Sequence, residues 1–287
     1  MTLQQITLGD LTFDVEVDGP ADGPAVLLLH GFPHSRASYA DVAPILNGAG
    51  FRTITPDQRG YSDGARPADV AGYALPLLAG DALGILDHLG IGSAHVVGHD
   101  WGAAVAWYLG ARHPERVRTL VALAIPHLDA YQHAFRVDEE QQHGSQYVEM
   151  LMAAGSADQF LADDSAGLWA WFAQAGEDIL TREQVERYVT KHSRPGVLDA
   201  ALNWYRANNL LGEPFGFGPV TVPTTFVWSP SDTAVSKLSV EKTQEYVTGP
   251  YQLVTLPEIS HWQPQQAPEA VAGEILRLAA TEQEAAR

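Results

Sequence analysis

Short apolar runs separated by amphipathic segments recur along most of the 287-residue chain. Runs that are apolar at every position are typical of strands buried on both faces of a sheet, whereas apolar residues three and four apart predict helices. The pattern predicts strands over residues 5–8, 12–17, 25–29, 51–57, 94–98, 117–126, 224–229 and 251–257. It predicts helices over residues 39–46, 75–90, 101–113 and 268–279. This alternation indicates an α/β protein with a mostly parallel central sheet flanked by helices.

The pattern changes in the middle of the chain. From residue 127 to about residue 212 there is no run of the buried-strand type, and helical periodicity predicts helices over residues 145–155, 165–176, 181–192 and 195–209. Thr181 and Gln184 have the spacing of a capping box, which marks the start of a helix. We therefore predict one α/β domain with an inserted all-helical cap. The core comprises residues 1–126 and 216–287, and the cap comprises residues 127–215.

The composition narrows the classes of function. The chain has 35 acidic and 17 basic residues, a formal net charge of −18. A surface of this charge repels nucleic-acid phosphates and anionic lipid, so we expect neither nucleic acid nor a membrane as a partner. The absence of cysteine excludes disulfides, thiolate catalysis and cysteine-bound zinc. We expect no metal and no other cofactor.

The N-terminal segment alternates apolar and polar residues, as a hairpin does, and lacks the basic and apolar regions of a secretory signal. No apolar run approaches the ~18 residues that a membrane-spanning helix needs. We therefore expect a cytoplasmic protein. The sequence leaves open whether it is a monomer or a homodimer.

The stretch HVVGHDWGAAVAWY, residues 95–108, reads as a short strand, a tight turn and a helix. This is the pattern of a nucleophile elbow, usually written G-x-S-x-G. Here Gly98 and Gly102 supply the small neighbours, and Asp100 stands in the middle position. The start of the following helix favours an anion. We predict that Asp100 is a nucleophile; the alternative is a plain helix N-cap, a common role for aspartate.

The loop after the strand over residues 25–29 reads HGFPHS. A turn of small residues there exposes backbone N–H groups that can face the elbow. We predict that the N–H groups of Phe32 and Trp101 form an oxyanion hole and that His30 supports the turn. The alternative is an ordinary strand-to-helix loop.

An acid and a histidine follow the elbow in the order that elbow hydrolases use: nucleophile, acid, histidine. Asp232 comes just after the strand over residues 224–229, and His261 lies between the last strand and the last helix. Sites in such sheets form at the carboxyl ends of the strands. We predict that Asp232 orients His261. The rival acid is Asp129, which follows an earlier strand.

The chain has 11 histidines, so a histidine is informative only through its position. Chain order and its loop favour His261 as the base. His99 stands beside the predicted nucleophile but is expected to point the other way. His127, at the start of the helical segment, is the competing base.

Aromatic residues of the helical segment are candidates for the pocket above the sheet. Tyr147 lies in SQYVEML and Tyr205 in LNWYRANN, and from a ceiling of helices a phenol can donate a proton to a substrate below. The alternative for each tyrosine is a packed side chain with its hydroxyl satisfied. The tryptophans and phenylalanine at 169, 171, 172 and 204 form either an apolar pocket wall or the core of the cap. We expect the substrate pocket to be lined by His30, Phe32, Pro33, Trp101, Trp204 and Trp262.

Together these motifs resemble the epoxide hydrolases of the α/β-hydrolase fold. The resemblance runs from about residue 10 to residue 275 and rests on the segments HGFP (30–33), GHDWG (98–102), SQYVEMLMAAG, LNWYR (202–206), Asp232 and HW (261–262). GHDWG together with LNWYR is a specific combination. The chain departs from the relatives in DQRGYSDGARP, where residue 62 is serine instead of the second glycine of D-x-R-G-x-G-x-S. That region is normally structural.

The resemblance implies the α/β-hydrolase fold with a helical cap or lid and a cofactor-independent hydrolase. By the family pattern, Asp100 is the nucleophile, and the Asp232–His261 pair activates water. Tyr147 and Tyr205 bind and protonate the epoxide oxygen. The substrates implied are a small apolar epoxide and water, and the product is a vicinal diol.

An aspartate nucleophile suits an epoxide for a chemical reason. A carboxylate that attacks a strained sp³ carbon forms an ester, which water can hydrolyse, whereas serine would form an ether. Aspartate, with an ordinary pKa of ~3.9, is ionised at neutral pH and needs no base. The histidine is then free for the second step, in which it draws a proton from water.

Other functions fit the residues less well. A haloalkane or haloacid dehalogenase uses the same ester chemistry. Such enzymes commonly have a halide-binding asparagine after His-Gly, and this chain has Phe32 at that position. Fluoroacetate-type dehalogenases carry an arginine after the elbow aspartate, where this chain has Trp101. A non-enzymatic binding protein on this fold would be expected to lack part of the triad. A serine esterase needs a serine at the elbow, where this chain has Asp100.

Overall fold

The computed structural model of the protein describes residues 2–173 and 179–285. Its centre is an eight-stranded sheet in the order β1-β2-β4-β3-β5-β6-β7-β8. The strands are β1 (Thr2–Leu8), β2 (Leu11–Asp18), β3 (Ala25–Leu29), β4 (Arg52–Pro56), β5 (Ala94–His99), β6 (Val117–Leu123), β7 (Thr224–Trp228) and β8 (Tyr251–Thr255). β1 and β2 pair antiparallel, as does β2 with β4, and the other neighbours are parallel. The predicted hairpin and the mostly parallel sheet are both confirmed.

Burial explains the position of each strand in the sheet. β3 and β5 are buried at every residue, so they suit the centre, where both faces are covered. Side chains of one strand alternate between the two faces. Val26 and Leu28 of β3 accordingly belong to one apolar cluster, and Leu27 and Leu29 belong to the other. β1 and β8, at the two edges, are exposed or half-buried at most positions.

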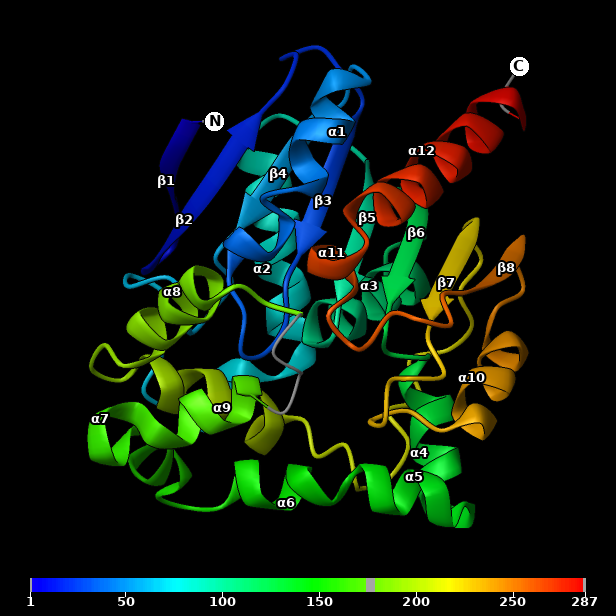
Figure 1. Cartoon of the computed structure of the whole chain (residues 1–287). Coiled ribbons are helices and arrows are strands. Elements are labelled where there is room, and N and C mark those ends of the chain that lie inside the picture. The colour runs from blue at the N-terminus through cyan, green and yellow to red at the C-terminus, as the bar shows by residue number, and fades with distance from the viewer. Residues whose placement is uncertain (1, 174–178, 286–287) are drawn as a thin grey trace.

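Helices cover both faces of the sheet (Figure 1). One face packs against α1 (Val42–Gly48) and α12 (Pro268–Ala285), and the other face packs against α2 (Leu75–His88) and α3 (Trp101–Arg112). The remaining core helices are α10 (Lys237–Thr243), α11 (Gln263–Gln266) and the short 3₁₀ segments η1 (Arg36–Tyr39), η2 (Val70–Tyr73), η3 (Pro114–Arg116) and η4 (Gln244–Tyr246). The α/β fold class predicted from the sequence is therefore confirmed.

Between β6 and β7 the chain forms a group of helices that we call the cap. These are α4 (Leu128–Val137), α5 (Glu139–Gly144), α6 (Gln146–Met152), α7 (Ser156–Ala173), α8 (Arg182–His192) and α9 (Val197–Ala207). In Figure 1 they lie beyond the ends of the strands toward which the arrowheads of β3 and β6 point. The predicted capping box at Thr181 and Gln184 is present at the start of α8. The boundaries 127 and 215 of the cap stay a prediction.

The structure adds helices that periodicity did not predict, namely α4, α5, α10 and the short α11. α5 is polar, with Gln141 as its buried residue, and polar contacts support it: Asp138 accepts the Glu140 N–H, and the Gln141 side chain donates to the Ala234 carbonyl. The helix predicted over residues 165–176 belongs to a longer segment, α7, which begins at Ser156 and contains a non-helical break at residues 162–165. Residues 174–176 of that prediction lie outside the described residues.

The position where the sequence departs from its relatives has a structural role. The Ser62 hydroxyl donates to the Asp57 carbonyl at 2.5 Å and accepts the Asp14 N–H at 3.0 Å. Ser62 therefore ties the loop after β4 to strand β2.

Within the described ranges, none of the helices combines the length and the apolar character needed to cross a bilayer.

Candidate active site

Asp100 occupies a strained turn between β5 and α3. Its φ of 53° and ψ of −123° lie outside the regions that non-glycine residues usually adopt. The turn brings backbone segments so close that a Cβ on Gly98 would lie 2.1 Å from the Gly102 carbonyl oxygen. A Cβ on Gly102 would lie 2.0 Å from the backbone carbonyl oxygen of Leu29. Only glycine fits at both positions. The Asp100 carboxylate makes no N-cap bond, so the plain N-cap interpretation is wrong.

The loop after β3 holds one oxygen of this carboxylate. Asp100 Oδ1 accepts the backbone N–H of Phe32 at 2.6 Å. A Cβ on Gly31 would lie 2.2 Å from the same oxygen, so glycine is needed there for the loop to come this close. The Phe32–Pro33 peptide bond is cis. The structure thus brings the predicted N–H of Phe32 to the predicted nucleophile.

His261 lies between two carboxylates. Its Nδ1 donates to Asp232 Oδ2 at 2.7 Å, and its Nε2 lies 3.6 Å from Asp100 Oδ2. Asp232 is held by the Ala234 N–H, which donates to its other oxygen at 3.0 Å. The rival acid Asp129 accepts the Gly216 N–H at 2.9 Å instead. Of the two candidate acids, Asp232 is therefore the one that contacts the histidine.

Burial and charge set the protonation of this group. Burial lowers the pKa of His261, but Asp232 and Asp100 outweigh it and raise that pKa to about 10. Burial raises the pKa of the Asp100 carboxyl, and its hydrogen bond and attraction to His261, with the Trp101 N–H, lower it overall below the usual value. At neutral pH the free site accordingly holds a carboxylate next to an imidazolium.

The other histidines named from the sequence have different surroundings from His261. The His99 ring does not point away: its centroid is 4.9 Å from that of His261, and its Nε2–H donates to the His261 carbonyl at 2.7 Å. His127 stacks on Tyr246 at 4.7 Å, and burial lowers its pKa to about 3. His127 therefore lies in an aromatic cluster and is not positioned as a base.

A cavity of about 200 Å³ opens above Asp100. Its lining comprises Phe32, Asp100, Tyr147, Trp171, Tyr205, Asp232, Thr233, Ala234, His261 and Trp262. A smaller adjoining cavity adds Trp101 and Tyr131, together with apolar residues of α3, α4 and neighbouring loops. Tyr147 comes from α6 and Tyr205 from α9, so two cap helices bring phenols to the space that Asp100 faces.

Both phenols are neutral at ordinary pH. Burial raises the pKa of Tyr147 and that of Tyr205 well above the usual value, and the Asp100 charge adds to the effect in each case. The Tyr205 ring packs edge-on against Phe32 at 5.6 Å and against Trp101 at 5.1 Å. These contacts fix the ring beside both predicted oxyanion-hole residues.

Three residues expected to line the pocket are absent from the described lining of both cavities: His30, Pro33 and Trp204. His30 has no exposed surface, accepts the Gln58 N–H through Nε2 and packs edge-on against Tyr61. The Trp204 indole N–H donates to the Arg59 carbonyl at 2.8 Å. Pro33 is buried in its loop. These side chains support the site from behind, so the prediction that they line the pocket is wrong.

The lining also includes residues that the sequence did not single out. Thr233 and Ala234 follow Asp232 in its loop, and Tyr131 lies on α4. Small loop residues carry no periodic signal, and α4 itself was not predicted. Trp171, one of the aromatic residues left open between pocket wall and cap core, lines the cavity and packs edge-on against Phe32 at 5.9 Å.

Comparison with known proteins agrees with this geometry. The model of the α/β-hydrolase fold family matches residues 24–264. Over 91% of each chain the protein is 29% identical to epoxide hydrolase A of Mycobacterium tuberculosis. It is 31% identical to epoxide hydrolase 3 of Xenopus tropicalis, over 91% of this chain and 72% of that one. A solved structure of epoxide hydrolase A from Mycobacterium thermoresistibile matches with a TM-score of 0.84 and 25% identity, over 96% of this chain and 97% of the other. The chain therefore belongs to the epoxide hydrolase family of the α/β-hydrolase fold.

Proposed function

We propose that this protein is an epoxide hydrolase, which converts an epoxide and water to a vicinal diol through an ester on Asp100. One observation carries the proposal. Oδ1 of Asp100 is held by a backbone N–H, while Oδ2 faces His261 and a cavity whose walls include two phenols. A carboxylate held in this way can attack, and phenols can protonate the oxygen that is released. The assignments of the residues below are part of this proposal.

In the first step, Asp100 Oδ2 attacks a carbon of the epoxide. A bond forms between this oxygen and the carbon, the ring C–O bond breaks, and its electron pair goes to the epoxide oxygen. The phenols of Tyr147 and Tyr205 donate hydrogen bonds to this oxygen, and one of them gives up its proton. The alkoxide is more basic than a phenolate, so a neutral tyrosine is a competent acid.

Esterification also changes the charge around His261. The ester of Asp100 is neutral, so one of the two carboxylates that raise the pKa of this imidazole is removed. The proton that leaves His261 replaces the one that the tyrosine gave to the substrate. The imidazole becomes the neutral base that the second step requires.

In the second step, His261 Nε2 takes a proton from water, which attacks Cγ of the Asp100 ester. Asp232 stabilises the imidazolium through Nδ1–H. The negative charge of the tetrahedral intermediate forms on the oxygen held by Phe32 N–H, beside the N–H of Trp101. Collapse of this intermediate breaks the bond to the alkyl oxygen. The alkyl oxygen takes a proton from His261 and leaves as the diol, and the new Asp100 carboxyl group returns a proton to His261, which restores the carboxylate and the imidazolium.

A halide leaving group would need different partners. Halide takes no proton, and it is held by convergent N–H donors. The residue after His30-Gly31 is Phe32, whose side chain provides an aromatic edge instead of a donor. Of the two positions that commonly supply halide-binding N–H donors, only the one after Asp100 has a side-chain N–H in this chain, that of Trp101. The two tyrosines of the cavity wall therefore favour an epoxide over a haloalkane or a haloacid.

The wall of the cavity suggests the kind of epoxide. Aromatic side chains, from Phe32, Trp171 and Trp262, make up much of the lining, so we propose a small apolar epoxide. The reaction uses no cofactor in this scheme. We also propose a cytoplasmic location.

The proposal is tested with a panel of small aryl and alkyl epoxides and haloalkanes. We expect diol from at least one epoxide and no halide from any haloalkane. Diol is detected by chromatography and halide by an ion-selective electrode. Halide release without turnover of any epoxide would establish the dehalogenase instead.

A further inference from the structure

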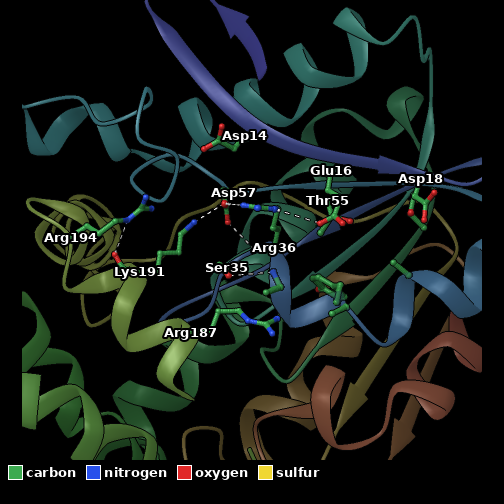
Figure 2. A pocket seen from close by; sticks show the side chains of 15 residues that line it. Asp14, Glu16, Asp18, Ser35, Arg36, Thr55, Asp57, Arg187, Lys191 and Arg194 are labelled. Atoms are coloured by element: carbon green, nitrogen blue, oxygen red, sulfur yellow. Dashed lines mark hydrogen bonds and ion pairs between the residues drawn. The ribbon is translucent and has the colours of Figure 1, made fainter. Parts of the chain in front are cut away.

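Another buried aspartate, Asp57, follows strand β4, which lies on the other side of β3 from β5. The side chain of Asp57 has no exposed surface, yet it lies between two cations (Figure 2). Arg36 of η1 reaches Oδ2 through its guanidinium, and Lys191 of the cap helix α8 reaches the same oxygen through Nζ at 2.6 Å. Burial raises the pKa of the Asp57 carboxyl, but Lys191 and Arg36 hold it below its usual value. The group is therefore an ion triad that joins core and cap.

Asp57 also fixes the loop that carries the proposed oxyanion N–H. β3 lies between β4 and β5, so its following loop runs between Asp57 and Asp100. The Phe32 N–H donates to Asp100 at 2.6 Å, and the Arg36 N–H donates to Asp57 Oδ1 at 3.0 Å. The neighbour of Asp57, Gln58, donates its side-chain N–H to the His30 carbonyl. The segment 30–36 is thus held by an aspartate near each end.

The helix α8 rests on this same segment. The ring of His192 lies 6.2 Å from that of Phe32, and the ring of Tyr188 lies 5.1 Å from that of His34. Lys191 stands between these two contacts in the sequence. Its ion pair with Asp57 is the charged contact of α8 with the end of β4.

A cleft of about 460 Å³ opens outside the triad, between β2, η1 and α8. Figure 2 shows the side chains of its wall: Glu16, Arg36, Asp57, Arg187, Lys191 and Arg194. Solvent therefore reaches the outer side of the contact, although the Lys191 side chain is only 13% exposed. Without the Lys191–Asp57 pair, ring contacts and the side chain of Gln265, which bridges Tyr188 and His34, would hold α8 against the segment 30–36.

We propose that Lys191 is a positioning residue: through its ion pair with Asp57 it docks α8 on the segment 30–36 and so holds the Phe32 N–H where ester hydrolysis needs it. This inference rests on the proposed function for its catalytic consequence. Lys191 does not touch the substrate cavity. Its effect passes through the loop.

The two chemical steps depend differently on this loop. In the first step Asp100 loses charge, so the N–H of Phe32 gives no added stabilisation to the transition state. In the second step a full negative charge forms on the oxygen that this N–H holds. A displaced loop therefore slows hydrolysis of the ester more than its formation, and the ester accumulates.

The test compares Lys191→Met with the wild-type enzyme and with two controls. Asp81→Asn breaks a similarly buried ion pair, Arg59–Asp81, whose side chains are 9% and 12% exposed. Arg187→Gln removes an exposed cation from the wall of the same cleft. Lys191→Arg is the conservative variant that keeps the cation.

We measure kcat on an epoxide that the wild-type enzyme hydrolyses, and the fraction of esterified Asp100 during turnover by mass spectrometry. For Lys191→Met we expect kcat to fall about tenfold, less than the loss on deleting an oxyanion donor, with a several-fold rise in the esterified fraction. Asp81→Asn should lower the melting temperature without a rise in ester. Arg187→Gln should match the wild type, and Lys191→Arg should recover most of the loss.

Hydrogen exchange of the peptide that contains Phe32 gives a second readout, which needs no substrate. Lys191→Met should raise exchange in residues 30–36, and Asp81→Asn should not. Equal effects of these two variants on ester and exchange, or no effect of Lys191→Met, would overturn the inference. If the wild-type enzyme turns over no epoxide, the proposed function fails, and the exchange experiment alone decides whether Lys191 positions the loop.

Discussion

Two buried aspartates, Asp57 and Asp100, end the strands on either side of β3, and their surroundings differ. Asp57 has both oxygens occupied, by the Arg36 N–H and by two side-chain cations. Asp100 has one oxygen bound to Phe32 N–H, whereas the other lies 3.6 Å from His261 and faces a cavity. Asp100 also stands at a positive φ.

The difference separates a structural carboxylate from a reactive one. A buried carboxylate whose two oxygens both bind cations or N–H groups ties parts of the fold together and presents no oxygen to the substrate cavity. A buried charge with one free oxygen in a strained turn carries a cost in stability that function can justify. Sequence position alone does not distinguish them, because each follows a strand.

The largest expected effect concerns activity at the two aspartates. Asp100→Asn should reduce kcat/KM for an epoxide by about 10⁴-fold or more, because it removes the nucleophile itself. Asp57→Asn should retain a much larger share, because it alters only the support of the loop. Steady-state kinetics of the two variants on one epoxide tests this order. Comparable losses of kcat/KM in the two variants would contradict the assignment of Asp100 as the reactive carboxylate and Asp57 as the structural one.

The second prediction separates the two steps at Asp100. His261→Gln should lower kcat by about 10²–10⁴-fold, the usual contribution of a general base, while ester formation continues. Intact-protein mass spectrometry should then find the mass of the substrate added, on the peptide that contains Asp100. Label on the peptide that contains Asp57 would contradict the assignment.

The third prediction concerns the phenols that face Asp100 and not Asp57. Tyr147→Phe or Tyr205→Phe should each slow ring opening by about 10–10²-fold, at the lower end of acid catalysis, and the double variant should be nearly inactive. Single-turnover rates of ester formation measure this directly. Normal rates in the double variant would show that the acids lie elsewhere.

The fourth prediction concerns stability. Here Asp57→Asn should have the larger effect and Asp100→Asn the smaller one, the reverse of their order for activity. Asp57→Asn should lower the free energy of unfolding by about 3–5 kcal/mol, since it leaves two partly buried cations without their carboxylate. Asp100→Asn should cost much less or stabilise the fold, as is common for active-site groups. Urea unfolding of both variants checks the order, and a larger loss for Asp100→Asn would refute it.

The last prediction concerns the dependence of stability on pH. The pKa of His261 is raised from 6.5 to about 10, so its ion pairs stabilise the fold fully below pH 6.5 and lose this contribution as pH rises toward 10. The difference in unfolding free energy between the wild-type protein and His261→Gln should therefore shrink between pH 6 and pH 10. An unchanged difference would mean that folding does not raise the pKa of His261.

Much of the fold could be predicted from sequence because its signals are local. Apolar runs such as AVLLL placed the strands, and their alternation with helices gave the parallel sheet. The polar helix α5 was not predicted, because its stability comes from contacts between residues far apart in the sequence, such as that between Gln141 and Ala234.

The candidate site was predictable where chain order carries information. Asp100, Asp232 and His261 follow the order of elbow hydrolases, and the structure brings them together. The pocket wall was not predictable in the same way. Consecutive residues of a helix point about 100° apart, and composition does not say that Tyr205 faces the cavity while Trp204 points to the Arg59 carbonyl. The Lys191–Asp57 pair joins residues far apart in the sequence and has no local signal.

The central claim is that Asp100 forms an ester with the substrate, and a single turnover in H₂¹⁸O tests it most directly. Excess enzyme converts a limiting amount of epoxide, and mass spectrometry measures the ¹⁸O content of the diol and of the peptide that contains Asp100. An ester that water opens at Cγ leaves ¹⁸O in the Asp100 carboxylate and ¹⁶O in the first diol. If the first diol carries ¹⁸O and the peptide carries none, water attacks the epoxide directly, and Asp100 is not the nucleophile.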